Sequence, residues 1–161
     1  SMYARQKNRV FDAAMRRGRT RLPGASMVLR TDGLRAAVRA LRAGTPFYFL
    51  PDMDLGARDA LFVPFFGVPA ATVTSVARLV RLTGAAVVPC VTRMTDDGYV
   101  VQLHPAWESF PGDDLYAATR RMNEFIEHCV LGMPAQYLWS HRRFKTRPPG
   151  EPGLYGDHDR R

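Results

Sequence analysis

The chain has 161 residues, of which 46% are hydrophobic, so it is long enough and apolar enough to form one domain with a packed core. Its 23 lysines and arginines outnumber its 15 aspartates and glutamates, which gives a formal net charge of +8. This composition excludes disorder throughout the chain. The positive charge favours polyanionic partners: nucleic acid, anionic lipid headgroups or phosphorylated substrates.

The cysteines and the hydropathy of the chain further limit the class of protein. Cys90 and Cys129 each lie alone in an apolar run, with neither a CxxC motif nor a nearby histidine pair, so we expect buried, reduced thiols and a reducing compartment. No apolar stretch reaches 18 residues, and residues 1–10 lack a signal-peptide hydrophobic region. The chain as given is therefore not expected to span a membrane.

The first 45 residues predict two helices and a short strand. Residues 7–17 place small apolar side chains on one side of a helix that ends near Gly18. Residues 26–30 predict a strand. Thr31 then caps a helix over residues 34–41, in which apolar residues recur at i, i+3, i+4 and i+7.

An apolar run leads into a polar turn in the next segment. Residues 46–50 ("PFYFL") predict a strand buried on both faces, followed by the turn 51–56 ("PDMDLG"), and polar residues after such a strand are a usual place for a site. Residues 60–67 predict a second extended segment, in which Pro64 indicates an edge or a break. Residues 72–82 predict another helix.

The remaining elements define the fold class. Residues 85–93 and 99–104 predict a strand, a turn and a strand, and a long helix follows over residues 115–131. This order of elements favours an α/β fold with a mixed sheet. We expect residues 1–148 to belong to a single domain and residues 149–161 to form a tail rich in Gly, Pro and charge.

Motifs for several common chemistries are missing from the sequence. It contains no P-loop, GxGxxG, GxSxG or HExxH, so NTPase, dinucleotide, hydrolase and zincin functions lack support. None of the four histidines has an acid five residues later. Asp52 and Asp54 could bind a metal or orient a base, but Asp and Gly are also ordinary turn residues, and the spacing alone favours the turn.

Basic side chains gather near both ends of the chain. Each group could be a solvated face, but guanidinium groups pair with phosphate bidentately, so phosphate recognition is a fair interpretation. Nucleic-acid binding ranks below lipid or phosphate binding because the aromatic residues lie in runs typical of a core. The two groups are Arg5, Lys7, Arg9, Arg16, Arg17, Arg19 and Arg21, and Arg142, Arg143, Lys145 and Arg147.

Four blocks, "FYFLPDMDLG", "LFVPFFGVPAATVTSVARL", "TGAAVVP" and "QYLWSHRRFKTRPPGEP", resemble in sequence and order the late acyltransferases of lipid A biosynthesis, the lauroyl and myristoyl transferase family. The similarity extends over about residues 3–155. It implies a glycerolipid-acyltransferase-like α/β fold, a mixed sheet flanked by helices, here incomplete at the N-terminal side. It also implies an enzyme at the cytoplasmic face of the inner membrane of Gram-negative bacteria.

The same resemblance implies the reaction and its partners. A fatty acyl chain moves from acyl carrier protein to a hydroxyl of a phosphorylated lipid A precursor, and the carrier thioester is the donor with no other cofactor. The wider group uses a histidine and an acid spaced HxxxxD or HxxxxE. That motif and a hydrophobic anchor precede the "MYARQKN" region in the family, and no such motif occurs here. We therefore expect this chain to be the C-terminal part of the enzyme and to be inactive by itself.

Site residues follow from the matching blocks. No catalytic residue and no metal ligand is expected in this chain; Asp52, Asp54 and Gly56 form the supporting turn, and residues 136–139 pack the end of the fold. Thr72 and Thr74 could donate their hydroxyls or cap a helix, and capping is the expected role. The residues expected to bind the acceptor's phosphates or face the membrane surface are Arg5, Arg19, Arg142, Arg143, Lys145 and Arg147.

Two further expectations concern self-association and an alternative function. An incomplete sheet exposes an edge strand, so the isolated chain is expected to self-associate. The alternative to an acyltransferase is a non-catalytic basic module that binds anionic lipid or nucleic acid, which the charge and the missing dyad also favour.

Overall fold

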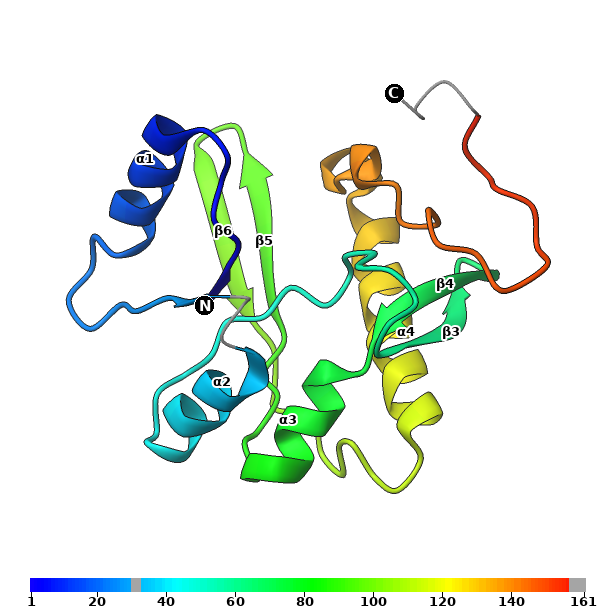
Figure 1. Ribbon diagram of the computed structural model, residues 1–161, viewed down its shortest axis with the longest axis horizontal. Helices are drawn as coiled ribbons and strands as arrows, with labels where there is room; N and C mark the ends of the chain where they lie inside the picture. The colour runs from blue at the N-terminus through cyan, green and yellow to red at the C-terminus, as the bar shows by residue number, and fades with distance from the viewer. Residues whose placement is uncertain (30–32, 157–161) are drawn as a thin grey trace. The chain divides into compact units, whose positions relative to one another are not determined.

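A computed structural model describes residues 1–29 and 33–156 (Figure 1). The chain divides into two compact units, Ser1–Phe49 and Leu50–Arg161, and each is described by itself. None of the helices in the described ranges is long and apolar enough to cross a membrane.

The first unit contains two helices and one short strand pair. Its elements are β1 (Met2–Tyr3), α1 (Arg9–Arg19), β2 (Val28–Leu29) and α2 (Gly33–Arg42), and β1 pairs with β2 in parallel. The side chain of Asn8 caps α1 by accepting hydrogen bonds from the backbone N–H groups of the second and third helical residues. Both expected helices are confirmed with small shifts of their ends. The expected cap, Thr31, lies outside the described residues, as does the last residue of the expected strand.

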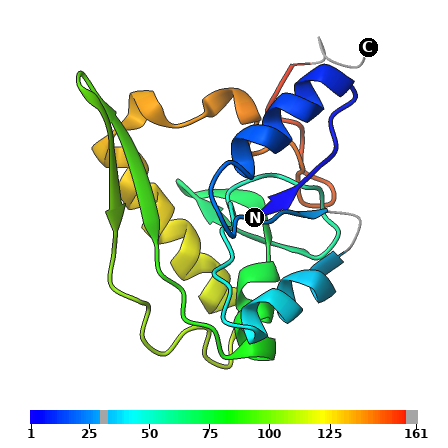
Figure 2. The ribbon, with the colours of Figure 1, turned by 90° about the vertical axis from the view of Figure 1, so that its left-hand side faces the viewer.

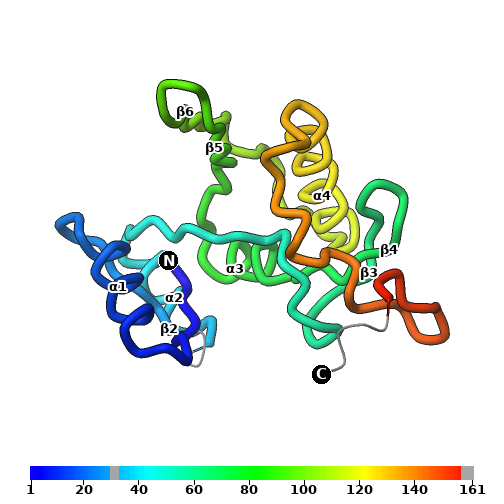
Figure 3. The backbone as a smooth tube through the Cα atoms, turned by 90° about the horizontal axis from the view of Figure 1, so that it is seen from above, coloured from blue at the N-terminus to red at the C-terminus, as the bar shows by residue number. Residues whose placement is uncertain are grey.

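The second unit holds the remaining elements. They are β3 (Ala60–Phe65), β4 (Val68–Val73), α3 (Ser75–Thr83), β5 (Cys90–Thr95), β6 (Gly98–Leu103), α4 (Leu115–Gly132), and the 3-10 turns η2 (Pro134–Gln136) and η3 (Trp139–His141). Seen from above, α4 lies between the β3–β4 and β5–β6 hairpins (Figure 3). Figure 2 shows the β5–β6 hairpin running beside α4.

The β3–β4 hairpin is the centre of the second unit's core. Its two-residue loop, Phe66 and Gly67, has positive φ at both positions (50° and 76°), as a type I′ turn requires. Val63 and Phe65 are fully buried, and α4 packs on their strand. Pro64, expected at an edge or a break, lies opposite a second proline in this two-stranded pair.

Three expectations about elements need correction. Residues 46–50 do not form a strand: Tyr48 and Leu50 are 55% and 53% exposed, since an apolar run is buried on both faces only where neighbouring strands and helices cover it. The helix expected from residue 72 begins at Ser75, because Thr72 and Val73 pair with β3. The α/β class is confirmed, but the described residues form three two-stranded sheets rather than one mixed sheet.

The cysteines are free thiols, as expected, but their burial differs from the expectation. Cys90 is exposed on β5, and Cys129 is half-buried on α4. Burial raises the pKa of the Cys129 thiol. An apolar run on a two-stranded hairpin therefore does not guarantee a buried side chain.

Candidate functional site

The "PDMDLG" turn is closed by its second aspartate. Asp54 is 3% exposed, and its Oδ1 accepts a hydrogen bond from the backbone N–H of Gly56 at 3.0 Å. Gly56 has a φ of 95°, which side-chain-bearing residues rarely adopt. The Asp and the Gly of this motif thus have complementary roles in one tight turn.

Asp54 also binds the segment that follows η3, 92 positions further along the chain. The backbone N–H of Thr146 donates to Asp54 Oδ2 at 2.6 Å, and the Thr146 hydroxyl donates to Oδ1 at 2.8 Å. The buried carboxylate therefore accepts three hydrogen bonds, which is the usual condition for keeping a charge away from water. We call the Asp54–Thr146 pair the latch, because it joins the "PDMDLG" turn to the closing segment, residues 142–147.

The first aspartate of the turn lies beside a tyrosine of the closing block. Asp52 is half-buried, and burial followed by the negative charge of Asp52 raises the pKa of Tyr137 above the ordinary value for a tyrosine. The Tyr137 ring packs against Phe65 with the ring centroids 5.9 Å apart. Its hydroxyl therefore stays protonated at physiological pH.

Arg143 points into the core, contrary to the expectation that it faces a membrane or a phosphate. It is 3% exposed, and its guanidinium donates to Ala71 O at 2.8 Å and to Thr72 Oγ1 at 2.5 Å. The guanidinium carbon lies 5.3 Å from the centroid of the Phe65 ring. Burial lowers the pKa of Arg143, while Tyr137 and the two aspartates of the turn act in the opposite direction.

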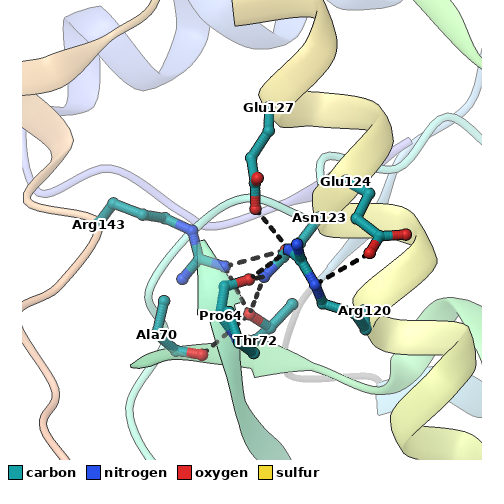
Figure 4. Close-up of polar contacts among 8 residues, drawn as sticks. All are labelled: Pro64, Ala70, Thr72, Arg120, Asn123, Glu124, Glu127 and Arg143. Atoms are coloured by element: carbon teal, nitrogen blue, oxygen red, sulfur yellow. Dashed lines mark hydrogen bonds and ion pairs between the residues drawn. The ribbon is translucent and has the colours of Figure 1, made fainter. Parts of the chain in front are cut away.

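A polar network on α4 completes the surroundings of Arg143 (Figure 4). Asn123 accepts from Arg143 at 3.4 Å and donates to Pro64 O at 2.9 Å and to Thr72 Oγ1 at 3.2 Å. Arg120 also donates to Pro64 O, at 3.0 Å, and pairs with glutamates on its own helix. Thr72, expected to cap a helix, instead joins the strand, the helix and the arginine in one buried network.

The other cations of the closing segment have different surroundings. Arg147 donates to Pro69 O at 2.6 Å and pairs with Glu151. Arg142 is half-buried, and its guanidinium carbon lies 5.6 Å from the centroid of the Tyr155 ring. Lys145 is exposed. Of the four closing-segment cations that were expected at a substrate, two are therefore hydrogen-bonded to the backbone of β4.

Residues 136–139 pack the end of the fold only in part. Tyr137 does so, but Leu138 and Trp139 are 68% and 50% exposed. Gln136 is exposed and bonds both backbone groups of Met94 on β5, at 2.7 and 2.9 Å.

Two expected site residues belong to the first unit. Arg5 and Arg19 are both exposed, and Arg19 donates to the backbone carbonyl of Met2 at 3.3 Å. Within the described ranges, His, Cys, Asp and Glu side chains do not gather in threes or more as metal ligands would.

Sequence reasoning missed Asn123 and Thr146 as members of this site. Asn123 could have been found, because an amide inside the apolar stripe of a helix must be hydrogen-bonded when it is buried. No sequence pattern distinguishes Thr146 from an ordinary loop threonine. Only its short distance to Asp54 in the structure does so.

Comparisons of the sequence with known proteins identify the family of this chain. The family described as "Bacterial lipid A biosynthesis acyltransferase" matches residues 1–146. The chain is 40% identical over 157 residues to the "Lipid A biosynthesis lauroyltransferase" of Escherichia coli (strain K12), which covers 96% of this chain and 51% of that protein.

Two other relatives agree with this match. The "Lipid A biosynthesis palmitoleoyltransferase" of Escherichia coli is 40% identical over 156 residues, or 95% of this chain and 50% of that protein. A "Lipid A biosynthesis acyltransferase" of Haemophilus influenzae is 35% identical over 153 residues, or 94% of this chain and 47% of that protein. The chain thus spans about half the length of these curated relatives. It belongs to the bacterial lipid A biosynthesis acyltransferase family.

Proposed function

We propose that the protein containing this chain transfers a fatty acyl chain to a hydroxyl of a lipid A precursor, with an acyl carrier protein thioester as donor. The observation that carries this proposal is the family match over residues 1–146, which includes all of the latch. The site of action would be the cytoplasmic face of the inner membrane, and the chain would be part of a glycerolipid-acyltransferase-like sheet.

The reaction needs a base that this chain does not supply in the HxxxxD or HxxxxE form. A histidine elsewhere in the intact protein would take the proton of the acceptor hydroxyl while its oxygen attacks the thioester carbonyl. The new ester C–O bond forms as the C–S bond breaks, the protonated histidine returns its proton to the sulfur, and the carrier leaves as a thiol. The isolated chain would then bind without catalysing the transfer.

This chain would provide the acceptor side of the active site. The turn with Asp52, Asp54 and Gly56 would lie beside the catalytic pair. Lys145 and Arg142 would contact the acceptor's phosphates or anionic headgroups, and contacts of the same type are proposed separately for Arg5 and Arg19 of the first unit. Arg143 and Arg147 would support this surface from β4, where their hydrogen bonds lie; phosphate contact by these two stays a prediction.

A transfer assay tests the proposal. The intact protein, given acyl carrier protein thioester and a lipid A precursor, should produce the acylated precursor, whereas residues 1–161 alone should not. An intact protein that is folded but transfers no acyl chain would contradict the proposed activity. Transfer by residues 1–161 alone would contradict the assignment of the base to another part of the protein.

One observation favours the alternative of a basic binding module. Helix α1 has no buried residue, and its exposed surface combines arginines with Val10 and Phe11, which are 80% and 56% exposed. Such a helix fits an anionic lipid surface. Binding measured over a range of salt concentrations distinguishes the two functions. Preference for lipid A over generic anionic vesicles and DNA supports the acyltransferase, and equal binding to all three supports the binding module.

A further inference from the structure

The closing segment presents one exposed cation between fixed neighbours. Arg143 is anchored on β4, Thr146 on Asp54, and Arg147 on Pro69, whereas Lys145 is exposed. The Lys145 backbone N–H donates to Arg142 O at 3.0 Å, which closes a turn at the lysine itself. Residues on both sides of Lys145 are therefore held, and its ammonium group is on the solvent side.

Asp54 is poorly suited to direct chemistry. Its carboxylate is 3% exposed, and three N–H or O–H donors occupy most of its acceptor capacity. A base or an orienting acid must instead reach a substrate or a histidine. The three bonds use Asp54 to hold backbone and hydroxyl groups in place.

We propose that Asp54 is a positioning residue that acts through Thr146: the latch holds the closing segment so that Lys145 meets the anionic group of the acceptor in a fixed orientation. This inference rests on the proposed function. A cation that is already held in place loses less conformational freedom on binding, so the latch contributes to acceptor binding and not to the chemical step. Opening it should raise the KM for the acceptor and leave kcat nearly unchanged.

Steady-state kinetics of the intact protein test this. Thr146→Val removes the hydroxyl and keeps the shape, and should raise the acceptor KM about tenfold or more, the loss expected for one hydrogen bond to a charged group. Thr146→Ser restores the hydroxyl and should restore the KM. Val63→Ala, a fully buried position on β3, is the control for stability lost without opening the latch, and its acceptor KM should not change.

A double-mutant cycle tests the route through Lys145. Lys145→Ala should raise the acceptor KM by itself, and adding Thr146→Val to it should raise the KM little further. Fully additive effects, or a kcat that falls as much as kcat/KM in Thr146→Val, would overturn the proposal.

Tryptic cleavage after Lys145 provides a measurement that needs no acyl transfer. In Thr146→Val the bond after Lys145 should be cut faster than in a Val63→Ala protein of equal global stability, because the latch opens locally. Equal cleavage in these two variants would overturn the latch. If the wild-type protein transfers no acyl chain, the proposed function fails, and this comparison alone decides whether the latch exists.

Discussion

Arg143 shows how a single side chain can have a role opposite to the one its neighbourhood in the sequence indicates. It lies among three other cations in six residues, but its guanidinium is buried against Ala71, Thr72 and the Phe65 ring. Its planar fork reaches a backbone carbonyl and a hydroxyl together, which a lysine ammonium on a flexible stem cannot reproduce as well.

Truncating Arg143 should destabilise the protein strongly. Arg143→Ala leaves Ala71 O and part of the Thr72–Asn123 network without a donor in a buried place, so the free energy of unfolding should fall by about 3 kcal/mol. Arg143→Lys keeps the charge and should cost less. Urea unfolding of both variants checks this; equal losses would show that the charge kept by lysine does not replace the hydrogen bonds of the guanidinium, and no loss in Arg143→Ala would contradict the buried network.

Tyr137 should make stability depend on alkaline pH. Its pKa in the folded protein is raised, so above the ordinary tyrosine pKa of about 10 the unfolded chain loses this proton while the folded chain retains it. The contribution is therefore complete below about pH 10 and is lost as the pH rises further. The urea midpoint of the wild type should fall more steeply between pH 9 and 11 than that of Tyr137→Phe; parallel curves would contradict this.

At the scale of elements, the helices were predictable because their apolar positions recur with a period near 3.6, as over Leu115–Gly132. The strand predicted at 46–50 was wrong because an apolar run records hydrophobicity, whereas a strand also needs a hydrogen-bonded neighbour. The start of α3 was misplaced because the β-branched Thr72 and Val73 fit the register of β4.

The hairpin and the long helix supply a matched pair of glycine substitutions. Gly67→Ala forces an alanine to a φ of 76° with no steric contact at its Cβ, so it should destabilise by about 1 kcal/mol through the backbone alone. Gly132→Ala, at the end of α4 with open space around it, should be neutral or stabilise by up to about 1 kcal/mol. Thermal unfolding measures both, and effects of the same sign would contradict the assigned conformations.

At the scale of the whole molecule, an exposed apolar strand is relevant to association. On the β5–β6 hairpin, Tyr99, Val101 and Leu103 are exposed, and within the described residues β6 pairs only with β5. An open strand edge with apolar side chains can pair with another copy, while the net charge of +8 opposes association until salt screens it.

Residues 1–161 alone should therefore self-associate increasingly as salt is added. The double variant Val101→Lys, Leu103→Lys should remain monomeric, because charges on an edge strand disfavour pairing. Leu131→Lys, at an exposed apolar position on α4, is the control with the same type of substitution and should behave like the wild type. Light scattering gives the mass; a monomeric wild type at high salt, or equal rescue by Leu131→Lys, would contradict a role for this edge.

The sequence by itself determined the family, the α/β class, most helices and the two motif blocks that contain Asp54 and Arg143, because periodicity and ordered motifs are local information. Only the tertiary structure decided which distant residues these blocks bind by hydrogen bonds. The Thr146 donors reach Asp54 across 92 positions, and Arg143 reaches Ala71 across 72. Which buried acceptor a side chain meets depends on how the elements pack, and a hydrogen bond forms only within about 3 Å.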